Sequence, residues 1–272
     1  MECQVWPGPR CPPSELKGQS SREKTKPHFT SLYFLSSKTP NSTMATNPYT
    51  VDSAVLAASI GSAVIYQAMV RAAPSFSRMV TKTASTTLLS IFTYLRGGPA
   101  LLVGALALGS TGDAFLAWND DTSFLFGLSS FLVAHILYII HFLHAGPGAG
   151  NIVSKLQVLQ NGDTWRLGTA WALGMLVPVM IVQLMPKVGK DLRAPVAVYS
   201  LTILVMVLMA LTLESREIVT GAVMFASSDS ILAAGRFLVP ATSAHQGWMH
   251  HAVWVLYYGG QFLIALGAVA RV

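Results

Sequence analysis

Two aspartates, Asp113 and Asp229, have the residue type and the setting for acid and base chemistry. They lie in the apolar stretches LLVGALALGSTGDAFLAW and TGAVMFASSDSILAAGRF, and of the twelve acidic residues only this pair falls well inside a predicted membrane span. A carboxylate at bilayer depth costs at least a few kcal/mol unless it faces the protein interior or a water-filled cavity, so such residues usually mark a functional site. Two readings stay open: a structural pair hydrogen-bonded to Ser or Tyr, and a reactive acid and base.

The composition places these aspartates in a membrane protein. Hydrophobic residues make up 52% of the chain and charged residues only 11%, which is far from the usage of soluble domains. The formal net charge of +6 comes from Lys and Arg spread over loops and an N-terminal tail, with no basic and aromatic stripe, so nucleic acid is not an expected partner. Cys3 and Cys11 both lie in that tail, which excludes a disulfide or a cysteine metal site in the apolar part.

The chain divides into a tail and one membrane domain. Residues 1–50 are rich in Pro, Ser, Lys and Arg and predict a disordered basic tail, and Met44 is a candidate for the natural start. Residues 51–272 predict an all-α polytopic bundle of about eight transmembrane helices, because most of the apolar runs approach the roughly 20 residues needed to cross a bilayer. The predicted spans are about 53–71, 82–95, 99–117, 123–143, 168–185, 195–213, 218–238 and 250–269.

The two aspartate spans resemble each other. GALALGSTGDAFLA and GAVMFASSDSILA share Gly-Ala, small hydroxyl residues, Asp and Leu-Ala, which suggests a 4+4 internal repeat. The third and seventh spans run in the same direction, and at 1.5 Å per residue the depths of the two aspartates differ by only roughly 5 Å. Small residues four apart, such as Ala105 and Gly109 before Asp113, favour close packing against other helices. The two carboxyl groups are therefore expected to share one cavity.

Other polar side chains lie inside the predicted spans and could support the pair. They are His135 and Tyr138 in the fourth span, Tyr199 in the sixth, and Trp254, Tyr257, Tyr258 and Gln261 in the eighth. A lone histidine in a span is commonly a packing residue, but next to buried carboxyl groups it can hydrogen-bond an acid. An interfacial aromatic belt explains Trp254 equally well, and packing explains the others.

Lys82 begins the second predicted span and is a candidate for binding a phosphate headgroup, although a basic residue at a helix end is ordinarily a snorkelling anchor. The chain has no Gly-x-Ser-x-Gly, Walker A, dinucleotide glycine or His-Glu-x-x-His motif. Serine-lipase, ATPase, NAD-dependent and zinc-protease mechanisms therefore lose support, and no cofactor is expected. Asp113, Asp229 and His135 are suitable metal ligands by type, but their spacing does not call for a metal.

Several short motifs occur together between about residues 50 and 270. They are Lys82 before the second span, Ser110-Thr111-Gly112-Asp113, Phe126-Gly127-Leu128 through His135 and Tyr138, Val198-Tyr199, Gly221-Ala222 through Phe225, Ser228-Asp229 with Leu232-Ala233, and Tyr257-Tyr258 with Gln261. This set resembles the YhhN-like lysoplasmalogenase family of polytopic membrane hydrolases.

The resemblance implies eight spans and hydrolysis of the vinyl ether bond of lysoplasmalogens, giving a fatty aldehyde and glycerophosphocholine or glycerophosphoethanolamine. It also implies that Asp113 and Asp229 are catalytic, with Ser110 and Ser228 among the supporting residues. Protonation of a vinyl ether at its β-carbon makes an oxocarbenium ion that water captures, so one acid and one base suffice, as in glycoside hydrolysis. Our hypothesis assigns Asp229 as the acid and Asp113 as the base.

Two other classes of function remain open from the residues alone. Intramembrane carboxyl groups, tyrosines and a repeat are also typical of a proton-coupled lipid or solute transporter. The third class is a membrane scaffold or receptor. For the enzyme, the expected partners are a lysophospholipid substrate and the surrounding membrane lipids, the oligomeric state is not predicted, and the lipid chemistry of the family implies the endoplasmic reticulum.

Overall fold

The structure, a computed structural model, describes residues 48–118 and 120–270, and these residues form α-helices and no strands. The predicted tail of residues 1–50 and the candidate start at Met44 fall almost wholly outside the described residues. The helices of the described part are α1 (Pro48–Met69), α2 (Phe76–Leu95), α3 (Ala100–Phe115), α4 (Asp121–His144), α5 (Ile152–Gln160), α6 (Thr164–Leu184), α7 (Lys190–Ala210), α8 (Arg216–Phe237) and α9 (His245–Val269).

Six of these helices are long and apolar enough to cross a membrane, namely α1, α4, α6, α7, α8 and α9. Helix α3 is apolar but has only 16 residues, and α2 has 20 residues with many hydroxyl side chains. The protein is therefore a polytopic helical membrane protein. All eight predicted spans overlap a long helix of the structure, with α2 and α3 as the two that do not meet the length and apolarity of a span.

Five helices, α1, α2, α6, α7 and α9, begin four to six residues before the predicted spans. Helix α2 begins at Phe76, six residues before the predicted start, because the Ser75 side chain caps it by accepting a hydrogen bond from the Arg78 backbone N–H. The connection predicted at about 144–167 contains the short helix α5, which Asn151 caps. Gly146, Gly148 and Gly150 have positive φ in that connection, so they act there as the breakers that the sequence indicates.

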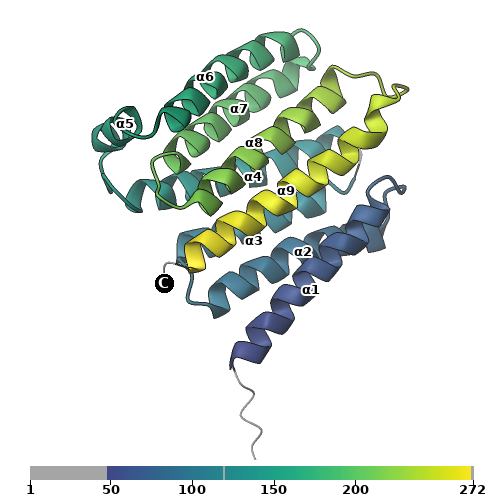
Figure 1. The fold of residues 1–272 in the computed structure, drawn as a ribbon. Coiled ribbons are helices and arrows are strands. Elements are labelled where there is room, and N and C mark those ends of the chain that lie inside the picture. Colours follow the sequence, from purple (N-terminus) through teal and green to yellow (C-terminus); the bar gives the residue numbers. More distant parts are fainter. Residues whose placement is uncertain (1–47, 119, 271–272) are drawn as a thin grey trace, which may run out of the picture. The chain divides into compact units, whose positions relative to one another are not determined.

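The long helices pack as sequential neighbours with two further pairings. Helix α3 packs between α2 and α4, and α8 packs between α7 and α9. In addition α4 packs on α7 and α2 packs on α9, so that α3, α4, α8 and α9 lie between α1 and α2 on one side and α6 and α7 on the other (Figure 1). The two aspartate helices are thus central elements of the bundle.

Small residues let these central helices approach closely. The predicted stripe on α3 is buried, since Ala105, Asp113 and Ala117 expose at most 1% of their surface. Between α8 and α9 the backbones nearly touch: a Cβ at Gly221 would lie 2.6 Å from the Gly260 carbonyl oxygen. A contact this short admits no side chain unless one helix moves, so the position of α9 against α8 depends on glycine.

We expect Gly221→Ala to lower the free energy of unfolding by about 1 to 3 kcal/mol, because the added methyl forces α8 away from α9. The matched control is Gly174→Ala in α6, where nothing lies within 4 Å of the added Cβ and the helix gains propensity. Thermal unfolding of both purified variants in detergent measures the difference. An unchanged melting temperature for Gly221→Ala would show that the helices tolerate wider spacing.

Candidate active site

Asp113 lies at the junction of α2, α3 and α9. Its Oδ2 accepts hydrogen bonds from the Thr86 hydroxyl at 2.8 Å and the Tyr257 hydroxyl at 2.7 Å. Its Oδ1 lies 3.2 Å from the Lys82 ammonium. Asp113 is 1% exposed and Lys82 is 9% exposed. The pair is therefore a buried ion pair, in which the charge on each partner is offset mainly by the other.

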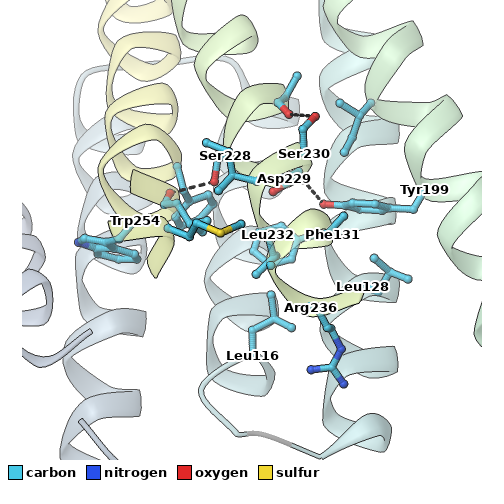
Figure 2. Close-up of a pocket in the computed structure, with 18 of the residues that line it drawn as sticks. Leu116, Leu128, Phe131, Tyr199, Ser228, Asp229, Ser230, Leu232, Arg236 and Trp254 are labelled. Carbon is cyan, nitrogen blue, oxygen red and sulfur yellow. Dashed lines mark hydrogen bonds between the residues drawn. The ribbon is translucent and has the colours of Figure 1, made fainter. Parts of the chain in front are cut away.

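Asp229 has a simpler environment on α8. The Tyr199 hydroxyl of α7 donates to its Oδ2 at 2.5 Å (Figure 2). Among the described residues no Lys, Arg or His side chain forms an ion pair with Asp229, and the side chain is only half-buried. The neighbouring Ser228 points elsewhere, because its hydroxyl donates to the Val253 carbonyl of α9 at 2.9 Å. The two aspartates thus differ in charge environment.

Both aspartates line one cavity of about 320 Å³. The end of the cavity near the start of α2 and α9 and the end of α8 carries its basic and amide side chains, Arg78, Arg236, Gln246 and His250, among apolar ones such as Phe124. We call it the polar end. The other end lies between α6 and α7 and is apolar, with Leu173, Val177, Ile203 and Val207 in its wall.

The aspartates lie between these two ends. Asp229 is eight residues from the end of α8, roughly 12 Å at 1.5 Å per residue. Val207 is seventeen residues from the start of α7, roughly 25 Å from the same side of the bundle. The cavity is therefore elongated and amphipathic, with the carboxyl groups part of the way along it.

The structure brings six of the predicted site residues to this cavity, namely Lys82, Asp113, Tyr199, Ser228, Asp229 and Tyr257. The other five predicted residues, Ser110, His135, Tyr138, Tyr258 and Gln261, do not line it. Ser110 bonds to Thr87 on the α2 side of α3, and the Tyr258 hydroxyl lies 2.8 Å from the Ser59 hydroxyl of α1. Their roles in a reaction stay predictions.

A cluster of buried polar side chains lies behind the cavity wall. The Tyr138 hydroxyl of α4 donates to Oε1 of Gln261 in α9, and both side chains are fully buried. Gln261 lies close to Tyr257, since a Cβ at Gly109 would be 3.0 Å from Gln261 Nε2 and 3.6 Å from the Tyr257 hydroxyl. Tyr257 in turn donates to Asp113. Gly109 therefore leaves the space in which these side chains meet behind the carboxylate.

His135 supports the wall from outside. Its Nδ1 lies 2.6 Å from the Phe131 carbonyl oxygen, so we assign the ring proton to Nδ1. Its Nε2 is buried and has no hydrogen-bond partner within the described part of the chain, and its ring contacts Tyr199 edge-on with 5.4 Å between centroids. His135 thus packs behind the tyrosine that holds Asp229. In residues 48–118 and 120–270 no three His, Cys, Asp or Glu side chains form a metal-binding group.

The sequence analysis missed three residues of this site. Thr86 donates to Asp113 and lies one helical turn after Lys82, a spacing that could have identified it. Arg78 and Arg236 both line the polar end of the cavity. Basic residues near helix ends are ordinarily anchors, so the sequence gives no signal that would separate these two from the others.

The fold and the site define a class, a multi-pass membrane protein with two carboxyl groups in an intramembrane cavity. The chain matches the YhhN family over residues 77–268, and it belongs to that family.

Curated relatives are similar to this chain over part of their length. The lysoplasmalogenase of Mycobacterium bovis is 34% identical over 171 residues, which cover 59% of this chain and 60% of the relative. The human lysoplasmalogenase TMEM86B is 31% identical over 173 residues, which cover 64% of this chain and 65% of the relative. The matched part spans less than two thirds of each relative. No solved structure shows significant similarity to the chain.

The buried ion pair predicts strong coupling between Lys82 and Asp113. Lys82→Met leaves a buried carboxylate unpaired and Asp113→Asn leaves a buried ammonium unpaired, so each should cost about 3 to 5 kcal/mol of stability. The double variant should be more stable than either single variant, because neither charge remains. Thermal unfolding of the four proteins measures the coupling.

The control for this cycle is the Arg96 and Asp52 pair, whose Arg96 side chain is 43% exposed. Its coupling should be at most about 1 kcal/mol. Strictly additive effects of Lys82→Met and Asp113→Asn would mean that the two charges do not stabilise each other.

Proposed function

We propose that the protein is a lysoplasmalogenase, which hydrolyses the vinyl ether bond of an alkenyl-glycerophosphocholine or alkenyl-glycerophosphoethanolamine. The observation that carries the proposal is the pair of aspartates with unlike charge environments in one amphipathic cavity. The printed names of the bacterial and human relatives support the same reaction. The substrate is then a lysophospholipid, with its alkenyl chain between α6 and α7 and its headgroup at the polar end.

The unlike environments support opposite roles for the two carboxyl groups. Asp113 pairs with the Lys82 ammonium and accepts two hydroxyl hydrogen bonds, so we assign it the ionised form and the role of base. Asp229 has the Tyr199 hydroxyl on one oxygen and no cation beside it in the described chain, so we assign it the protonated form and the role of acid. Thr86, Tyr199 and Tyr257 are positioning residues in this scheme.

The reaction then proceeds in two stages. Asp229 donates its proton to the β-carbon of the vinyl ether, and the negative charge of Asp113 stabilises the oxocarbenium ion that forms. Asp113 removes a proton from water as the water oxygen bonds to the α-carbon, which gives a hemiacetal. The hemiacetal C–O bond to glycerol breaks as Asp113 returns a proton to the leaving oxygen and Asp229 takes the hydroxyl proton. The products are a fatty aldehyde and the glycerophospho base, and both aspartates return to their starting states.

We also propose that residues 51–272 form one catalytic domain with eight membrane spans, in which α2 and α3 complete the six clear spans. The helix neighbours support a 4+4 repeat in which α2, α3 and α4 correspond to α7, α8 and α9. Under this correspondence the contact of α4 with α7 is equivalent to the contact of α9 with α2, and both contacts are present. Each aspartate also accepts a hydrogen bond from the helix before its own, α2 for Asp113 and α7 for Asp229. For the location of the protein we propose the endoplasmic reticulum, which the lipid chemistry of the family implies.

Asp113→Asn and Asp229→Asn should each reduce aldehyde release by more than about a hundredfold, because general acid and base catalysis contributes about 10² to 10⁴ in rate. The matched control is Asp191→Asn, which lies exposed in the first turn of α7 and should keep the wild-type rate. Mass spectrometry of aldehyde formed from an alkenyl-glycerophosphocholine by the purified proteins gives the rates.

Wild-type rates in both cavity variants would overturn the mechanism. The same preparation in proteoliposomes tests the transporter: movement of the intact lipid without any free aldehyde would replace the hydrolase by a carrier.

If α2 and α3 both span the membrane, the start of α2 and the start of α3 lie on opposite sides of it. The only cysteines, Cys3 and Cys11, are first replaced by Ser. Ala73→Cys before α2 and Ala100→Cys at the start of α3 should then react with an impermeant maleimide from opposite sides of sealed vesicles. Labelling of both positions from one side would leave six spans and make α2 and α3 a re-entrant pair.

A further inference from the structure

The polar end of the cavity raises the question of which group would hold a phosphate. Among the described residues three Lys or Arg side chains line the cavity, namely Arg78, Lys82 and Arg236. A phosphate ester that enters the cavity is bound best by a cation whose N–H groups are still available. The hydrogen bonds of the three side chains separate them.

Arg78 and Lys82 are committed to other partners. Arg78 donates through Nη1 to the Ala117 carbonyl at 2.8 Å and through Nη2 to the Val70 carbonyl at 3.3 Å. It therefore holds the turn after α3 against the end of α1. Lys82 forms the buried ion pair with Asp113. A ligand that took Lys82 would leave the buried Asp113 carboxylate without its cation, which is costly. The Nε–H of Arg78 has no hydrogen-bond partner among the described residues, but this atom is buried, and both Nη groups hold backbone carbonyls.

Arg236 has no buried carbonyl or buried carboxylate as a hydrogen-bond partner among the described residues. Its only ion pair in the described chain is with Asp121, from Nη2 to Oδ1 at 2.6 Å. The Asp121 side chain is 81% exposed, and an exposed pair contributes little because water screens it. The guanidinium carbon Cζ lies over the Phe124 ring, 4.0 Å from its centroid. This contact positions the guanidinium, while its remaining N–H groups stay available for the bidentate contact that phosphate favours.

The position of Arg236 fits the length of a lysolipid headgroup. Arg236 follows Asp229 by seven residues on α8, so both lie on one face, about 10 Å apart along the axis. Figure 2 shows Arg236 beyond Leu232 on the same helix. In the substrate five bonds join the vinyl ether oxygen to phosphorus, a reach of about 6 Å at roughly 1.5 Å per bond in a zigzag chain. A hydrogen bond of about 3 Å at the phosphate end closes the remaining distance.

We propose that Arg236 binds the phosphate of the lysolipid, and that its guanidinium forms the ion pair with Asp121 when no lipid is bound. This assignment rests on the proposed function and gives the headgroup its site, with Lys82 kept for Asp113. The carboxylate of Asp121 competes with the incoming phosphate, and Phe124 keeps the guanidinium directed along the cavity wall.

Binding of lipids that cannot be cleaved tests Arg236 separately from catalysis. The probes are a saturated 1-alkyl-glycerophosphocholine, the corresponding 1-alkylglycerol without phosphate, and inorganic phosphate. Trp118 and Trp254 line the cavity, so a change in tryptophan emission on addition of the probe in detergent reports occupancy. The variants are Arg236→Gln, Arg236→Lys and Asp121→Asn, and the matched control is Arg71→Gln, an exposed arginine after α1 that does not line the cavity.

Arg236→Gln should weaken binding of the phosphocholine lipid on the order of tenfold, because it removes a charge-assisted hydrogen bond. Binding of the alkylglycerol should be unchanged. Arg236→Lys should fall between the wild type and Arg236→Gln, since it keeps the charge but loses the fork. Asp121→Asn should bind the phosphocholine lipid at least as tightly as the wild type, and Arg71→Gln should equal the wild type.

Three results would overturn the assignment. The first is unchanged phosphocholine binding in Arg236→Gln, and the second is an equal loss for the alkylglycerol, which would make the role structural. The third is inorganic phosphate binding as tightly as the lipid, which would assign the site to free phosphate. Aldehyde release by the wild type is measured in parallel and decides the hydrolase alone, because the probes bind without being cleaved.

Discussion

The buried ion pair between Lys82 and Asp113 is the interaction on which the site depends. A carboxylate inside a helical bundle is stable only if its charge and its lone pairs are satisfied. Two neighbouring helices meet this need, because α2 supplies Lys82 and Thr86 while α9 supplies Tyr257. Asp113 on α3 thus joins α2 to α9 through its own bonds.

The second aspartate is left chemically different by the same arrangement. The cation of the cavity interior is already paired with Asp113, so Asp229 lies in the same cavity with the Tyr199 hydroxyl as its bonding partner and, among residues 48–118 and 120–270, no ion pair. Two carboxyl groups in one cavity with unlike neighbours are the usual structural basis for separate acid and base roles. The proposed acid and base roles therefore require no difference in residue type. They require only that a neighbouring helix places a cation beside one aspartate and not beside the other.

Much of this could be predicted from the sequence, for physical reasons that also explain the misses. A charge inside an apolar run is conspicuous, so Asp113 and Asp229 were identified, and Tyr199 and Tyr257 stood out as hydroxyl groups in spans. Helix α5 was not predicted from the sequence, because the glycines from Gly146 to Gly150 indicate a loop and the nine helical residues that follow are too few to form a span. Arg236 was missed because only the bundle shows that its neighbours leave its N–H groups available, and no local pattern carries that information.

The shortness of α3 has a consequence for the end of that helix. The partners of Asp113 on α2 are Lys82 and Thr86, so the residues of α2 before Lys82 extend roughly 9 Å past the last turn of α3. Arg78 fills that step by binding the Ala117 carbonyl. This carbonyl is one of those that the end of a helix leaves without an intrahelical partner, so Arg78 caps the short α3 from inside the bundle.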